Sequence, residues 1–125
     1  MSRAFAFVLL VLASSPALAQ ATQGGRPAYE NDLQRLSEIL GALHYLRDLC
    51  GAREGQTWRN EMQALVDAEA PSGERKEHLT ASFNRGYRGF QQSYRTCTPA
   101  ADFAIRRYLE EGAKIARDIT ARYAN

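Results

Sequence analysis

Apolar residues recur every three or four positions along most of the chain, which is the spacing of one face of an α-helix. The clearest series predicts a first helix from Tyr29 to Cys50, and Gly51 follows it as a C-cap residue. Alternation of apolar and polar residues, which is typical of strands, is nearly absent from the sequence. The pattern therefore predicts an all-α protein. The apolar stripe of the first helix consists of Leu33, Leu36, Ile39, Leu40, Leu43, Leu46, Leu49 and Cys50.

The same spacing predicts three further helices. The second begins near Thr57, a favourable N-cap residue, and ends at Pro71. The third follows Ser72, and the fourth opens with Thr98 and Pro99. Short connections favour antiparallel neighbours, so we expect a four-helix up-down-up-down bundle in a single domain over residues 30–125. The inner stripe of the fourth helix would be Ile105, Leu109, Gly112, Ala116, Ile119 and Tyr123.

The first 19 residues have the three parts of a secretory signal peptide. Arg3 supplies the positive charge, residues 4–13 form an uninterrupted apolar run, and Ala17 and Ala19 are the small residues of the cleavage site. The alternative is a retained membrane anchor, but the run is about half of the ~20 residues that span a bilayer. We expect a signal peptide over residues 1–19, a flexible leader over 20–29, and no stable membrane insertion after cleavage.

The chain contains two cysteines, Cys50 and Cys97. An even number in an exported protein favours a disulfide. In the predicted bundle Cys50 ends the first helix and Cys97 lies between the third and fourth, so both fall at the same end. Closing this loop would stabilise the fold by about 4 kcal/mol. The alternative is a redox or metal site, but no C-x-x-C motif is present and neither cysteine has a histidine at ligand spacing. We expect no metal and no cofactor.

The net charge of the chain bears on which class of partner it can bind. The net charge is +2 and falls to about +1 once Arg3 is removed with the signal peptide. Nucleic-acid-binding proteins usually carry a clear basic excess on one face, so we expect no nucleic-acid partner.

The sequence lacks a catalytic constellation. The motifs G-x-S-x-G, G-x-x-x-x-G-K-[ST] and H-E-x-x-H are absent. His44 and His78 lie on different predicted helices, and the adjacent Glu110 and Glu111 would point about 100° apart on a helix. An enzyme that acts on envelope material, with His44 or an inter-helix carboxylate as its base, stays as an alternative.

Residues 83–95 form the most unusual stretch, with two glycines, four aromatic residues and three arginines in one predicted helix. One interpretation is packing, in which the glycines admit a neighbouring helix and the aromatic side chains fill the core. The other is a recognition surface in which Arg85 and Arg88, one turn apart, hold a carboxylate or phosphate. Arginine and tyrosine are also common in binding hot spots. The candidate binding residues are Arg85, Tyr87, Arg88 and Tyr94.

Four segments carry a resemblance: LGALHYLRDLC at residues 40–50, FNRGYRGF at 83–90, TCT at 96–98 and IARDI at 115–119. Together they resemble a family of small exported alphaproteobacterial proteins catalogued as conserved hypothetical, of unknown function. The likeness includes both cysteines. It implies a periplasmic location in a Gram-negative cell, and it brings no activity and no catalytic residue.

These observations favour a non-enzymatic periplasmic domain that binds another cell-envelope component, with a protein as its partner. Besides the enzyme, a second alternative is a small-ligand carrier with an aromatic pocket between the third and fourth helices. Its lining residues would be Phe83, Tyr87, Phe90 and Tyr108.

Overall fold

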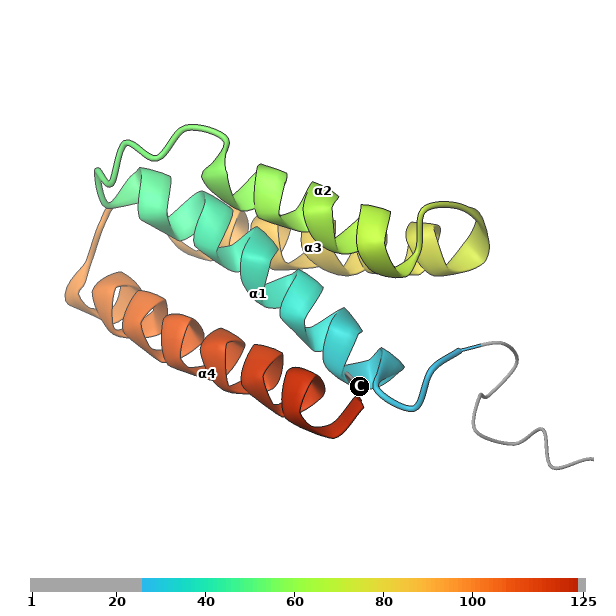
Figure 1. Ribbon diagram of the computed structural model, residues 1–125. Coiled ribbons are helices and arrows are strands. Elements are labelled where there is room, and N and C mark those ends of the chain that lie inside the picture. Colours follow the sequence, from blue (N-terminus) through green and yellow to red (C-terminus); the bar gives the residue numbers. More distant parts are fainter. Residues whose placement is uncertain (1–25, 124–125) are drawn as a thin grey trace, which may run out of the picture.

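The structure, a computed structural model, describes residues 26–123 of the chain. This part contains four helices and no strand, which confirms the predicted all-α class (Figure 1). The helices are α1 (Glu30–Leu49), α2 (Thr57–Glu69), α3 (Gly73–Ser93) and α4 (Pro99–Tyr123). The predicted signal peptide and residues 20–25 of the predicted leader lie outside the described residues. Within residues 26–123, no helix is both long enough and apolar enough to cross a membrane.

Helix α1 is the centre of the molecule. Each of the other three helices packs against it, and α2 also contacts α3 at a few positions (Figure 1). No Cα atom of α4 lies within 8 Å of a Cα atom of α2 or α3. Helices α3 and α4 therefore have no close backbone approach and meet through side chains instead. The aromatic rings of Phe90 and Tyr108 fill the space between these two helices, with their centroids 5.5 Å apart.

The apolar side chains form two core clusters, and α1 contributes to both. One cluster joins α1 to α2 and α3, and its members are Leu33, Leu40, Met62, Val66, Ala70, Leu79 and Phe83. The other joins α1 to α4, and its members are Ile39, Leu43, Leu46, Ala101 and Ile105. Ser37, Gly41 and Ala42 are buried as well. Helix α1 is thus covered on several faces, more than the single predicted stripe implies.

Two glycines allow α1 and α3 to cross with their backbones in direct contact. A Cβ atom at Gly41 would overlap the carbonyl oxygen of Phe83, and a Cβ atom at Gly86 would overlap that of Glu38. A Cβ atom at Gly89 would have nothing within 4 Å. The interpretation that glycines in residues 83–95 admit a neighbouring helix is therefore confirmed for Gly86 and wrong for Gly89.

The two cysteines form a disulfide, as predicted. Cys50 and Cys97 are joined by an S–S bond of 2.06 Å, with their Cα atoms 5.0 Å apart. Cys50 directly follows α1, and Cys97 lies in the short segment between α3 and α4. The bond therefore fixes the end of α1 to the start of α4.

A buried ion pair ties the first turn of α1 to the first turn of α3. Arg75 Nη2 lies 2.8 Å from Glu30 Oε2, and the Glu30 side chain is only 6% exposed. Arg75 also donates a hydrogen bond to the carbonyl oxygen of Glu69, near the end of α2. Its hydrogen bond with Glu30 raises the pKa of Arg75, against the opposing effect of burial. One guanidinium group thus connects three helices.

Candidate functional site

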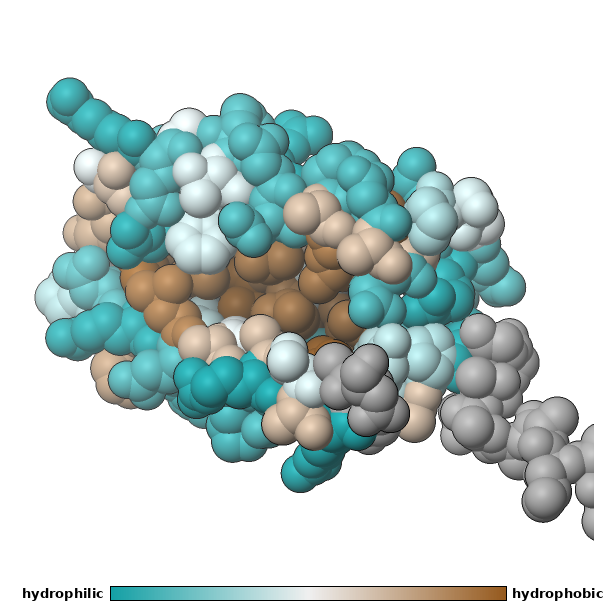
Figure 2. Space-filling view, in the orientation of Figure 1, coloured by the Kyte–Doolittle hydropathy of each residue, from teal (hydrophilic) through white to brown (hydrophobic). Residues whose placement is uncertain are grey.

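An apolar groove lies between α2 and α4. Figure 2 shows it as a hydrophobic hollow across the centre of one face, flanked by hydrophilic side chains. The hollow has a volume of about 670 Å³. It exists because α2 and α4 do not pack on each other. We call it the α2–α4 groove, and its floor on α1 is formed by Leu33, Leu36, Ile39, Leu40 and Leu43.

Both walls of the α2–α4 groove carry small, exposed side chains. They are Ala64 and Ala68 on α2, and Ala113 and Ala116 on α4. Leu109 is 36% exposed on the α4 wall. The prediction that Leu109 and Ala116 face the core is therefore wrong, because α2 does not reach across to cover them.

The charged residues that line the α2–α4 groove are acidic. They are Glu61 and Glu69, both on α2, and no lysine or arginine is among the lining residues. Glu69 accepts a hydrogen bond of 3.0 Å from the Tyr29 hydroxyl. Tyr29 belongs to the predicted leader, and its ring packs against the first core cluster.

A second cavity lies between α2 and α3, with a volume of about 380 Å³. We call it the α2–α3 cleft. It shares no lining residue with the α2–α4 groove. Its apolar lining comes from Met62, Val66 and Phe83, all buried, and its charged lining residues are Arg59, Lys76 and Arg88.

His44 reaches the α2–α3 cleft from α1. Its ring centroid lies 5.4 Å from that of Tyr87 and 6.0 Å from that of Phe83. Its Nδ1 atom is buried and has no hydrogen-bond partner among the described residues. Burial lowers the pKa of His44, and the charge of Arg59 lowers it further, against the opposite effect of Asp48. Burial and the charge of Arg59 both favour the neutral imidazole.

The four predicted binding residues do not lie together in the structure. Tyr87 and Arg88 line the α2–α3 cleft. Arg85 is not among its lining residues. Tyr94 lies near α4, with its ring stacked on that of Phe90 at 6.0 Å and its carbonyl oxygen accepting a hydrogen bond from the Tyr45 hydroxyl. Arg85 and Arg88 thus do not line one cavity, although they are one turn apart.

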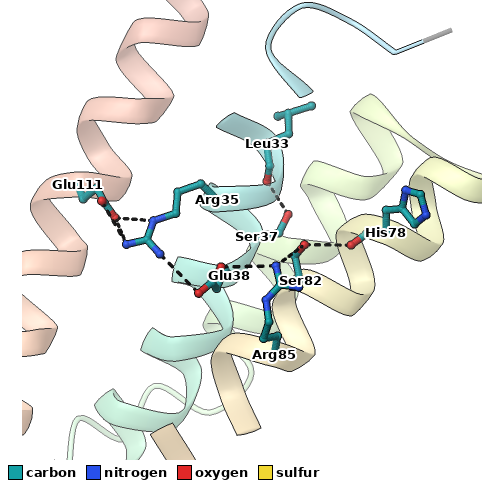
Figure 3. A network of polar contacts seen from close by, with 8 residues as sticks. All are labelled: Leu33, Arg35, Ser37, Glu38, His78, Ser82, Arg85 and Glu111. Carbon is teal, nitrogen blue, oxygen red and sulfur yellow. Dashed lines mark hydrogen bonds and ion pairs between the residues drawn. The ribbon is translucent and has the colours of Figure 1, made fainter. Parts of the chain in front are cut away.

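Arg85 instead belongs to a polar network that crosses three helices (Figure 3). Its Nη2 atom lies 3.6 Å from Glu38 Oε2 on α1. Arg35 lies 3.5 Å from the other Glu38 oxygen and 2.8 Å from Glu111 Oε2 on α4. The Arg35 guanidinium also lies 5.4 Å from the ring centroid of Tyr108. This network links α4 to α1 and α1 to α3.

The predicted aromatic pocket between α3 and α4 is not formed as one cavity. Phe83 and Tyr87 line the α2–α3 cleft. Phe90 and Tyr108 line a separate hollow of about 310 Å³ beside α4. Tyr87 and Phe90 are only three residues apart on α3, but they line different cavities because the helix packs against different neighbours along its length.

The sulfur atoms of the two cysteines lie close to a carboxylate. Cys50, Cys97 and Asp102 offer ligand atoms that all lie within 4.8 Å of one another. The two sulfur atoms are bonded to each other, so the two cysteines form a covalent crosslink in the structure.

Both cavities contain residues that the sequence did not single out, notably Arg59 and Lys76 in the cleft, and Ala64, Ala68 and Ala113 in the groove walls. Ala64 with Ala68, and Ala113 with Ala116, repeat at helical spacing on helices that also carry larger apolar residues. That repeat is a weak signal of a face that keeps room for a neighbour. Nothing comparable marks Arg59 or Lys76.

Comparison with protein families assigns most of the chain to a family. A family model described as "Protein of unknown function (DUF2385)" matches residues 28–123, which include all four helices and both cysteines. Neither the curated proteins nor the solved structures gave a match.

Proposed function

We propose, from the premise that this chain belongs to the DUF2385 family, that it is a non-enzymatic binding domain of a Gram-negative cell envelope. In this proposal the α2–α4 groove holds an amphipathic helix of another envelope protein. The signal peptide directs the chain to the periplasm of an alphaproteobacterial cell and is cleaved after Ala19.

The observation that carries the proposal is the apolar lining of the α2–α4 groove. Its floor residues Leu33, Ile39, Leu40 and Leu43 are at most 8% exposed, and the parts open to solvent are Leu36, Leu109 and the wall alanines. Apolar side chains that gather in a hollow open to solvent are a common feature of interaction sites. Four of the five floor residues, Leu33, Ile39, Leu40 and Leu43, also belong to the two packed clusters around α1. An occupant would cover Leu36, Leu109 and the exposed alanines of the two walls.

The shape of the groove favours a helix as that occupant. Its walls are themselves helices, and in the up-down-up-down order that we infer from the short connections they run in the same direction. The 13 residues of α2 give a wall about 20 Å long, enough for three to four turns of a partner helix. The wall alanines leave space for its apolar side chains, as in other helix-in-groove complexes.

Charge complementarity indicates which charged residues the partner helix should carry. Glu61 and Glu69 make the polar lining negative, so the partner helix should carry lysine or arginine beside its apolar stripe. An acidic helix would be repelled.

Export is supported by two features of the sequence. The apolar run over residues 4–13 and the small residues Ala17 and Ala19 match a cleavable signal. The disulfide is of the kind that persists in oxidising compartments such as the periplasm.

Site-specific photo-crosslinking in intact cells tests this proposal. A photoreactive phenylalanine analogue is placed at Ala64 or Ala116 in the groove, and at Phe103 as a control. Phe103 is 58% exposed on α4 and lies outside the groove. We expect both groove positions to capture the same segment of one envelope protein, with apolar residues at helical spacing and flanking basic residues. Phe103 should not capture it.

A synthetic peptide of the captured segment gives the second measurement. Leu109→Glu should weaken its binding at least tenfold, whereas Phe103→Glu should leave it unchanged. Capture of a second copy of the chain, or of a lipid acyl chain, would contradict a partner helix. Equal crosslinking at all three positions would remove the groove as the binding site.

A further inference from the structure

The cations that line the α2–α3 cleft are exposed side chains without an acidic partner within residues 26–123. Arg59, Lys76 and Arg88 make no ion pair or side-chain hydrogen bond with the described residues, and no aspartate or glutamate lines this cleft. By contrast, Arg35, Arg47, Arg75 and Arg85 each pair with a carboxylate.

The cations are arranged around an apolar surface. The buried side chains of Met62, Val66 and Phe83 lie between the two helices that carry them. Lys76 and Arg88 are 12 positions apart on α3, which corresponds to about 18 Å along the helix. The cleft is therefore elongated, with cationic groups near both ends of α3 and an apolar stretch along its length.

Several lining residues of the cleft lie around His44. Tyr87 lies next to Arg88 in sequence and contacts the ring of His44. Arg59 is close enough to His44 for its charge to act on the imidazole. Tyr87 and Gln91 add hydrogen-bonding groups to the lining. Guanidinium groups are well suited to bind carboxylates and phosphates, through two parallel hydrogen bonds.

We propose that the α2–α3 cleft binds a soluble small molecule with a carboxylate or phosphate group attached to an apolar body. The anionic group pairs with Arg59 and Arg88, and the apolar body lies over Met62, Val66 and Phe83. The volume of about 380 Å³ is in the range of small-molecule sites. This site is independent of the proposed function, since the two cavities share no lining residue.

The test is a titration of the full, disulfide-bonded chain, followed by the backbone amide signals in NMR spectra. The probes are 3-phenylpropionate, phenyl phosphate, inorganic phosphate and the neutral 3-phenylpropanol. We expect the two anionic aromatic probes to shift the amide signals of cleft residues such as Thr80 and Asn84. Inorganic phosphate should bind at least tenfold more weakly, because it lacks the apolar body, and 3-phenylpropanol should bind more weakly still.

Variants on one helix provide the matched control. Arg88→Gln and Arg59→Gln should each weaken binding of the anionic aromatic probes at least tenfold. Arg85→Gln removes the same charge from α3, three residues from Arg88 but outside the cleft, and should leave binding unchanged. Added salt should weaken binding in the wild type more than in Arg88→Gln.

Four results would overturn the proposal. They are equal binding of 3-phenylpropanol, wild-type affinity in Arg88→Gln, shifted signals confined to groove residues, and no binding of any anionic probe at millimolar concentration. Vesicles containing an anionic phospholipid are a further probe. Arg88-dependent sedimentation with them, without binding of the soluble probes, would assign the anionic group to a lipid instead.

Discussion

The imidazole of His44 has an unpartnered, buried Nδ1 atom and a cationic neighbour in Arg59. Both conditions favour the neutral ring. We expect an NMR titration to give His44 a pKa below its ordinary value near 6.5. Arg59→Gln should raise this pKa without restoring the ordinary value, because burial is the larger cause. No change in this variant would show that the charge of Arg59 does not reach the ring.

The same shift has a consequence for stability. Because the pKa of His44 is lower in the folded chain, the unfolded chain takes up the proton first as pH falls. The stabilisation is present above pH 6.5 and is lost as pH falls from there towards the folded pKa. The free energy of unfolding should therefore decrease more between about pH 7 and pH 5 in the wild type than in His44→Gln. Parallel pH profiles would contradict this prediction.

Arg75 is the residue whose loss should be most costly among the charged groups. Arg75→Met leaves the Glu30 carboxylate buried without its cation, and one Glu30 oxygen already lacks a partner among the described residues. We expect the free energy of unfolding to fall by about 3 kcal/mol, measured by urea denaturation. Lys114→Met, which removes the cation of an exposed i,i+4 pair, should change little. Similar effects of the two variants would mean that the Glu30 pair is as solvated as a surface pair.

At the scale of helices, the crossing of α1 and α3 predicts different effects on stability for alanine substitutions at different glycines. Gly41→Ala and Gly86→Ala should each destabilise the fold by about 2 kcal/mol or more, because the new Cβ atom meets a backbone carbonyl that cannot rotate away. Gly89→Ala should be neutral or stabilise by up to about 1 kcal/mol through helix propensity. Urea denaturation midpoints measure all three. A loss in Gly89→Ala equal to that in Gly86→Ala would contradict the crossing as the cause.

The helices themselves could be predicted because their signals are local. Apolar spacing, Pro71 and Gly51 mark where helices run and end, and the observed bounds agree within a few residues. The N–H of Ala101 donates to Thr98 Oγ1 at 3.1 Å, as expected of an N-cap residue. Which glycine lies at a crossing depends on the neighbouring helix, so Gly86 and Gly89 could not be distinguished from the sequence.

At the scale of the whole molecule, the disulfide is the simplest element to test. Cys50→Ser and Cys97→Ser should each lower the free energy of unfolding by about 4 kcal/mol, and reduction of the wild type should do the same. In thermal melts the loss corresponds to a decrease in Tm of roughly 15 °C or more. The double variant should match the single variants. Two thiols that titrate freely in the untreated protein would contradict the crosslink.

The two cavities could not be predicted, and the reason is geometric. The apolar stripe of α4 shows that Leu109 and Ala116 are suited to contact, but not which helix lies opposite. The structure places α1 at the centre and leaves α2 and α4 apart, which turns part of that stripe into a groove wall. For the cleft, the sequence pointed to Arg88 and Tyr87, whereas Arg59 and Lys76 join them only through the packing of α2 on α3.

The position of the disulfide also sets the route of a mechanical force through the molecule. Tension applied at the two ends of the described chain passes along α1, across the Cys50–Cys97 bond and directly into α4. Residues 51–96, with α2 and α3, lie on a closed ring outside that route. At about 3.5 Å per extended residue, the disulfide shortens the fully stretched chain by roughly 160 Å, because residues 51–96 are not extended. A chain pulled open and released would therefore begin to recoil with the end of α1 and the start of α4 already together.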